Sequence, residues 1–143
     1  MPALIELSAD ESEHLLRRAT LGRVVVTTPD GPEVLPVNYA VDGRTIVVRI
    51  GADGILARHG AGDVLFEVDH VDEERWHGWS VVARGRAEVT EGVTRTDHRP
   101  LPRPWADGER EHELRLTWTT LTGRRIGAGW DLTTSMYSRR ADR

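Results

Sequence analysis

The chain contains no cysteine and no lysine, and both absences narrow its chemistry. Without cysteine there is no disulfide, no zinc–thiolate centre and no thiol nucleophile. Without lysine there is no Schiff-base chemistry and no lysine general base. All 19 cationic side chains are arginine, so an anion must be held by guanidinium groups, backbone N–H groups or hydroxyls. Genomic base composition explains the missing lysine more simply than function does.

Long apolar runs and an excess of basic residues are also missing. No segment approaches the roughly 20 apolar residues of a membrane span, and no signal peptide is recognisable, so we expect a cytoplasmic protein that does not bind membranes. The net charge of −4 and the lack of a basic stripe argue against a nucleic-acid partner. The 143 residues suffice for one domain, with a core over about 8–127 and a polar tail at 128–143.

The stretch Glu33–Ile50 reads EVLPVNYAVDGRTIVVRI and predicts a β-hairpin. Its turn signal is Asp42-Gly43, because an Asp-Gly pair between apolar runs tolerates the positive φ of a tight turn. Pro36 lies inside the first run, where it cannot donate a ladder hydrogen bond. Arg49 lies at the end of the second run. An interrupted ladder beside a strand-end arginine can hold an anionic ligand, but an ordinary edge strand with a solvated arginine gives the same pattern.

The rest of the chain predicts further short elements. Ser8 and Glu11 form a capping box that starts a helix running to about Thr20, and Gly85 predicts a bulge inside a long strand. Alternating apolar residues predict strands at 23–28, 63–71, 78–90 and 113–126, with a short helix at 54–59. Strands dominate, so we expect a mainly β fold, an antiparallel barrel of six strands. Side chains fill so small a barrel, and a cofactor would therefore bind outside it, between subunits.

Motifs for metal binding or nucleophilic catalysis are missing, so we predict no metal site and no catalytic side chain. The acidic residues around Asp69 fit a solvated strand end better than an acid–base pair. Trp76 and Trp79 could cover a flat ring or bury a subunit interface. Arg84 and Arg86 share one strand face, where they are either solvated or aimed at a phosphate.

Taken in order, several segments resemble the pyridoxamine 5′-phosphate oxidase-like superfamily, the flavin-binding split barrels, and above all its small actinobacterial members. These segments are LGRVVVTT, VLPVNYAVDG, DVLFEVD, GWSVVARGRAEV and TGRRI, within about residues 13–126. The resemblance implies a six-stranded Greek-key split barrel that forms a homodimer. FMN, or a deazaflavin coenzyme in some branches, would lie at the subunit interface. The flavin would transfer hydride, while the protein supplies position and electrostatics.

The resemblance also implies which residues hold the cofactor. The segment 35–38 would lie along the isoalloxazine ring, the strand end at 49–50 would reach the phosphate, and the strand at 79–81 would come from the other subunit. Arg58 is added below on a separate argument. The predicted cofactor-binding residues are Leu35, Pro36, Val37, Asn38, Arg49, Ile50, Arg58, Trp79 and Ser80.

The chain departs from the family at the phosphate. Members usually carry a hydroxyl residue after the strand-end arginine and a lysine about five residues later, but here these positions hold Ile50 and Ile55. Losing a charge-assisted contact costs roughly 1.5–3 kcal/mol. Arg58, one helical turn after Ile55, is placed to compensate. Two functions follow. The first is an FMN- or deazaflavin-dependent oxidoreductase of a small molecule. The second is a non-enzymatic or degenerate split-barrel dimer that binds flavin or another ligand weakly or not at all.

Overall fold

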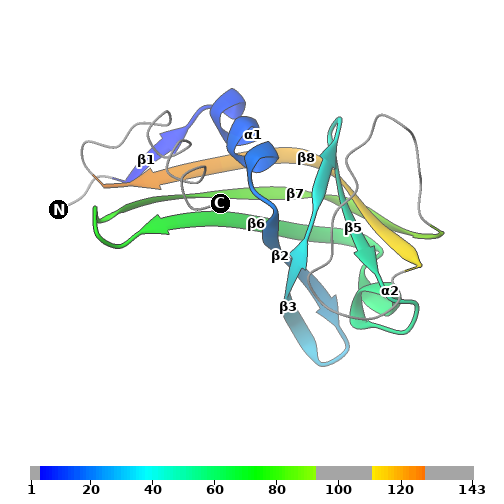
Figure 1. The fold of residues 1–143 in the computed structure, drawn as a ribbon. Helices are drawn as coiled ribbons and strands as arrows, with labels where there is room; N and C mark the ends of the chain where they lie inside the picture. Colours follow the sequence, from blue (N-terminus) through cyan, green and yellow to red (C-terminus); the bar gives the residue numbers. More distant parts are fainter. Residues whose placement is uncertain (1–3, 93–110, 128–143) are drawn as a thin grey trace.

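The structure is a computed structural model that describes residues 4–92 and 111–127. Its strands form one antiparallel sheet that curls around an apolar core, with two short helices beside it (Figure 1). The expected mainly β barrel is therefore confirmed, but the described residues hold eight strands rather than six. The elements are β1 (Leu4–Leu7), α1 (Ala9–Arg18), β2 (Leu21–Thr28), β3 (Gly31–Asn38), β4 (Ala40–Asp42), β5 (Thr45–Ile50), α2 (Ile55–His59), β6 (Gly62–Asp72), β7 (His77–Glu91) and β8 (His112–Ile126).

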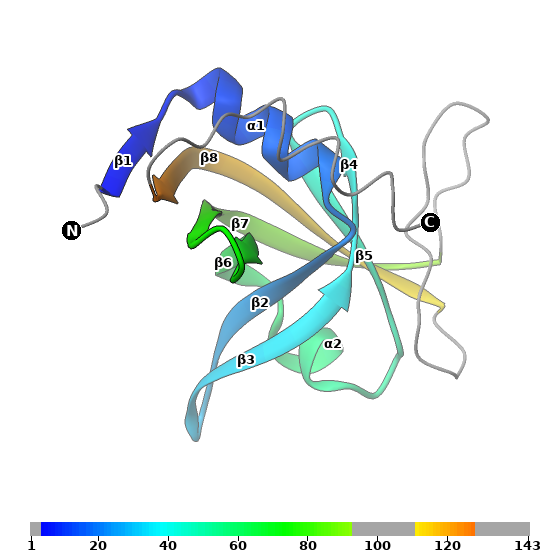
Figure 2. The same cartoon turned by 60° about the vertical axis from the view of Figure 1, so that its left-hand side comes forward.

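The strand order is β3-β2-β6-β7-β8-β5-β4, and β1 pairs with β8. β8 follows β7 along most of its length, while its other edge is shared between β5 and β1. Because one long strand serves two partners, the sheet bends into a partly closed barrel, and α1 lies across one end of it (Figure 2). Of the helices in the described residues, neither is long and apolar enough to cross a membrane.

The core consists of the residues that alternate along the predicted strands. Phe66 is fully buried at the centre of β6, and the ring of Tyr39 meets it edge-on with centroids 4.7 Å apart. The same alternation buries Ile46 and Val48 on β5. Side chains thus fill the barrel, as expected of one this small, and the sites available to a ligand lie on its outer surface.

The capping box of α1 is confirmed. The hydroxyl of Ser8 accepts a hydrogen bond from the Glu11 N–H at 3.1 Å, and the Glu11 carboxylate accepts one from the Ser8 N–H at 3.4 Å. The helix ends at Arg18, slightly before the predicted end at Thr20. Ala19 is already extended, with φ −82° and ψ 166°, and this turns the chain into β2.

The predicted hairpin over Glu33–Ile50 is only partly correct. Its second half is a hairpin of β4 and β5, but its first half, β3, pairs with β2 at the far end of the strand order. The strand is interrupted at Tyr39. The Tyr39 N–H donates to the Thr20 carbonyl, and the Tyr39 hydroxyl donates to the Leu16 carbonyl. The two-residue turn is Gly43-Arg44, one residue later than predicted, and its positive φ falls on Gly43 alone, as in a type II′ turn.

The predicted bulge at Gly85 is confirmed. Opposite the step from Arg84 to Gly85, β8 contains one extra residue, Thr119, and the pairing register shifts there. At this point the two backbones lie so close that a Cβ atom on Gly85 would stand 2.0 Å from the Thr117 carbonyl oxygen. Glycine is therefore required by the strand contact itself.

Candidate functional site

The exposed edge of β3 is the first part of the site. Among the described strands β3 pairs only with β2, so its other edge carries backbone groups that no strand uses. The Tyr39 N–H points toward the β2 side, where it donates to the Thr20 carbonyl at 3.1 Å. Because backbone groups alternate in direction along a strand, those of Pro32, Val34 and Pro36 point outward. Pro36 is thus an edge-strand proline, and its carbonyl faces outward without an N–H beside it.

The side chains of β3 divide between the two faces of the sheet. Leu35 and Val37 are half-buried and pack against the core. Val34 is 59% exposed, and Pro36 is also exposed on the outer face. The predicted cofactor segment from Leu35 to Asn38 therefore offers backbone atoms along an edge, beside an apolar outer surface.

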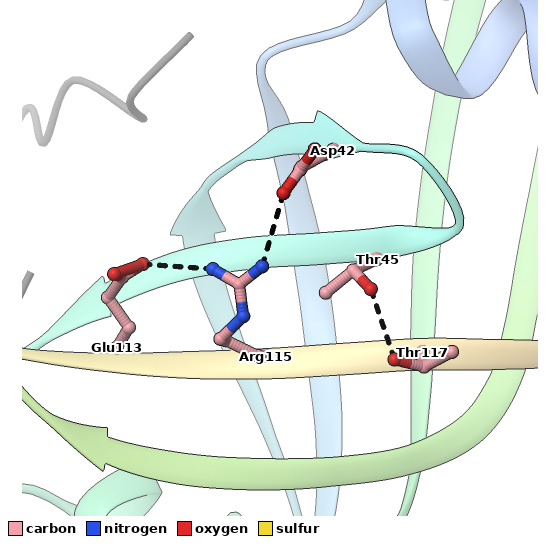
Figure 3. A network of polar contacts seen from close by, with 5 residues as sticks. All are labelled: Asp42, Thr45, Glu113, Arg115 and Thr117. Carbon is pink, nitrogen blue, oxygen red and sulfur yellow. Dashed lines mark hydrogen bonds and ion pairs between the residues drawn. The ribbon is translucent and has the colours of Figure 1, made fainter. Parts of the chain in front are cut away.

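Arg49 lies among opposite charges at the end of β5. Directly across the ladder is Glu113, which is 0% exposed. The Glu113 carboxylate is 3.4 Å from Nη1 of Arg115, whose Nη2 is 3.2 Å from Oδ2 of Asp42 (Figure 3). The positive charges of Arg49 and Arg115 are thus offset by the negative charges of Glu113 and Asp42 at this end of the barrel. Ile50 is 4% exposed and belongs to the core, so only its backbone can meet a ligand outside the barrel.

The helix α2 follows the loop after β5 and carries the other predicted phosphate contact. Ile55, the position at which the family resemblance led us to expect lysine, is half-buried and packs against the core. Arg58 is exposed in the last turn of the same helix. The structure therefore leaves Arg58 accessible at this end of the barrel, and it explains how isoleucine fits at 55.

Trp79 and Ser80 do not meet β3 within one chain, because β2 and β6 separate β7 from β3. Trp79 is 5% exposed and packs in the core, with its ring 6.5 Å from that of His70. Ser80 is half-buried on the outer face, opposite Asp69 and Arg124. Among the tryptophans within residues 4–92 and 111–127, Trp76 is the exposed one, at 84%, in the turn between β6 and β7.

A carboxylate pair on β6 joins Asp69, which the sequence analysis assigned to a solvated acidic cluster with Asp72, Glu73 and Glu74, to Glu67, which it did not single out. Nη1 of Arg23 lies 2.8 Å from Oε2 of Glu67 and 3.1 Å from Oδ2 of Asp69. Burial raises the pKa of Glu67 to about 7, with a further rise from Asp69 and an opposing effect from Arg23. The alternation of Glu67 and Asp69 along one strand was visible, but their shared arginine follows only from the pairing of β2 with β6. This pair holds a proton near neutral pH.

We expect Glu67→Gln to flatten the pH dependence of stability. A carboxyl whose pKa is higher in the folded chain stabilises the fold most below its ordinary pKa of 4.5, and that contribution is lost as pH rises through about 7. Since the side chain is partly solvated, we expect the loss to be about 1 kcal/mol. Urea unfolding across this pH window measures it, with Glu74→Gln in the exposed turn as the control. Equal slopes for the parent and Glu67→Gln would contradict the assignment.

Comparison with known proteins gives, among others, four matches. A family model described as pyridoxamine 5′-phosphate oxidase matches residues 8–125. The uncharacterized protein Rv0080 of Mycobacterium tuberculosis is 35% identical over 132 residues, which cover 87% of each chain. Among solved structures, the FAD binding protein from Mycobacterium smegmatis is 33% identical, with a TM-score of 0.66 over 86% of this chain and 98% of that one. A putative pyridoxamine 5′-phosphate oxidase from Corynebacterium glutamicum is 31% identical, with a TM-score of 0.71 over 92% and 98%.

Proposed function

Because the chain belongs to the pyridoxamine 5′-phosphate oxidase family, we propose that it binds a flavin along the exposed edge of β3 and serves as an oxidoreductase of a small molecule. The observation that carries this proposal is the outward-facing backbone of Val34 and Pro36, next to an apolar surface. A bound flavin would accept a hydride from one molecule and donate it to another. The residues of the chain bind and orient it, and no described side chain is assigned as a nucleophile.

The edge matches part of the hydrogen-bonding pattern of a flavin ring. Val34 offers an outward N–H and an outward carbonyl, while Pro36 offers only a carbonyl. The pyrimidine side of a flavin presents carbonyl oxygens on both sides of one N–H, so it needs two donors with one acceptor between them, and Val34 alone supplies one donor and one acceptor of that set. The exposed Val34 and Pro36 side chains provide an apolar surface beside that edge.

The phosphate end fits less well. Arg49 faces the buried carboxylate of Glu113, so its charge is partly offset before any ligand binds. Arg58 adds one exposed cation, and Ile55 adds none. This favours the second candidate function, a split barrel without enzymatic activity that holds a flavin weakly. The two candidates differ in affinity and turnover, and both use the same edge.

A spectrum of the purified protein and three titrations test the proposal. We predict FMN as the bound flavin, while FAD is bound by the Mycobacterium smegmatis relative and a deazaflavin is the third form to compare. Flavin absorbance in the purified protein, or a Kd on the order of micromolar for one of the three, supports binding. Oxidation or reduction of the bound flavin by a small molecule then supports the enzyme. If none binds at about 100 μM, the flavin-dependent oxidoreductase fails, and only the second candidate, a non-enzymatic split barrel that binds flavin weakly or not at all, is left.

We also propose that two copies form a homodimer with the flavin between them. This arrangement would let Ser80 of the partner subunit approach a flavin that the first chain holds at β3. It is supported by the separation of β3 from β7 within one chain and by the apolar outer surface at Val34 and Pro36. Sedimentation velocity with and without the tightest flavin tests it, and a monomer under both conditions would contradict it.

We expect Arg58→Ala to weaken binding of a phosphate-bearing flavin about tenfold, because a charge-assisted contact contributes roughly 1.5 kcal/mol. The side chain is exposed, so the fold should be unaffected. Fluorescence titration with FMN and with riboflavin, which lacks the phosphate, separates the contact from ring binding. Arg18→Ala at the end of α1 serves as the control. If the Arg58→Ala variant binds FMN as tightly as the parent, Arg58 does not contact the phosphate.

A further inference from the structure

A pocket of about 530 Å³ lies on the outer face of the sheet, across β2, β6 and β7. The strand register builds its floor from two rows of side chains. Val25, Leu65 and Arg84 face one another across three strands in the first row. In the neighbouring row Asp63 lies opposite Arg86, and Thr27 follows Val25 two residues along β2. Val25 and Leu65 therefore give the pocket an apolar part, and Arg84, Asp63 and Arg86 give it a charged part.

The charges of the pocket leave one cation uncompensated. Nη1 of Arg86 is 3.2 Å from Oδ1 of Asp63, so this pair is neutral as a unit. Within residues 4–92 and 111–127, the guanidinium of Arg84 makes no hydrogen bond and no ion pair. A guanidinium matches a carboxylate through two parallel N–H bonds. A phosphate dianion would bring a second negative charge close to Asp63, so a single carboxylate suits the pocket better.

The bulge fixes the point from which Arg84 reaches the pocket. The Thr119 hydroxyl, on the extra residue of β8, donates to the Arg84 backbone carbonyl at 3.2 Å. Both residues line the pocket. The backbone of Arg84 is therefore held on both sides, by β6 and by the bulged strand, beside the half-buried Val25 and Leu65.

From these observations we infer a second binding site, for a small molecule with one carboxylate and an apolar body. The carboxylate lies on the Arg84 guanidinium and the apolar body on Val25 and Leu65. None of these side chains is among the predicted cofactor residues. The site needs no flavin, and it can be tested whether or not the proposed cofactor binds.

Calorimetric titration of the full chain, without added flavin, tests the inference. The ligands are 2-naphthoate, its neutral amide and inorganic phosphate. We expect naphthoate to bind with a Kd of about 1 mM or below, and the amide at least roughly fivefold more weakly. Arg84→Gln should weaken naphthoate binding about 5- to 10-fold, whereas Asp63→Asn should strengthen it about threefold by releasing Arg86. The control is Arg124→Gln, an exposed arginine on the same face, which should leave binding unchanged.

Several results would overturn the inference. If naphthoate and its amide bind equally well, the carboxylate does not contact Arg84. If phosphate binds through Arg84 more tightly than naphthoate does, the site prefers phosphate and not a carboxylate. No naphthoate binding at about 10 mM would remove the site altogether. Because Arg84 is exposed, its variant should fold, and circular dichroism checks this. If it does not fold, Asp63→Asn decides alone: an unchanged or weaker affinity for naphthoate would contradict the site.

Discussion

Replacement of Gly85 by alanine is expected to destabilise the fold by about 3 kcal/mol or more. The added Cβ would lie 2.0 Å from the Thr117 carbonyl oxygen and 2.8 Å from its carbonyl carbon. Both are backbone atoms between β7 and β8, the two longest strands, so neither can rotate away as a side chain would. The strands must separate at the bulge, and this costs ladder hydrogen bonds and core packing. Equilibrium unfolding in urea measures the difference.

Gly54→Ala is the matched control for that experiment. The Cβ at this position would have only the Gly51 carbonyl oxygen nearby, at 3.9 Å, which is ordinary contact. Its φ of −79° suits alanine, and although Gly54 is the N-cap of α2 it makes no side-chain cap hydrogen bond, so we expect a loss of no more than about 1 kcal/mol. If Gly85→Ala also stays within about 1 kcal/mol of the parent, the close approach at the bulge does not constrain the sheet.

The second large effect is expected for Arg49→Gln. We expect flavin affinity to fall about 10- to 100-fold, since the strand end loses a charge-assisted contact to the phosphate. Stability should fall as well, by about 1–3 kcal/mol, because Glu113 is fully buried opposite Arg49 and would keep only the 3.4 Å contact with Arg115 to offset its charge on that side. Titration with FMN and urea unfolding measure the two losses separately. Unchanged flavin affinity would exclude Arg49 as the phosphate anchor.

Glu113→Gln separates the two roles of Arg49. It removes the carboxylate opposite the arginine, so the cation becomes more available and flavin affinity should rise by roughly two- to tenfold. In the double variant Arg49→Gln/Glu113→Gln, much of the lost stability should return while affinity stays low. If Glu113→Gln lowers affinity as much as Arg49→Gln does, the carboxylate positions the arginine and does not compete with the ligand.

The sequence predicted those parts of the fold that depend on local pattern. The capping box of α1 needs only Ser8 and Glu11, and the bulge at Gly85 follows from one glycine inside a strand. Alternation correctly predicted Ile46, Val48 and Ile50 as buried on β5, where Val47 is buried as well, and Val64, Phe66 and Val68 as buried on β6. Each of these features is set by neighbours in the chain, so one sequence is enough to find it.

The features that the sequence missed depend on which strand lies beside which. Glu33–Asn38 alternates equally well whether it pairs with β5 or with β2, and the break at Tyr39 depends on partners at Leu16 and Thr20. The opposition of Arg49 and Glu113 joins residues far apart in the chain. The pocket at Arg84 likewise exists only in the register of β2, β6 and β7. The sequence therefore suggested candidate charges for the site but could not show which groups lie opposite them.

The two prolines of β3 also limit how the chain can assemble. An incoming strand that extended the sheet at this edge would need N–H donors at alternate residues, and Pro32 and Pro36 supply none at two of those positions. The edge is therefore a poor template for intermolecular sheet growth, which protects the chain from edge-to-edge aggregation. Two copies that met at this edge would therefore have to rely on side-chain packing rather than on a shared backbone ladder.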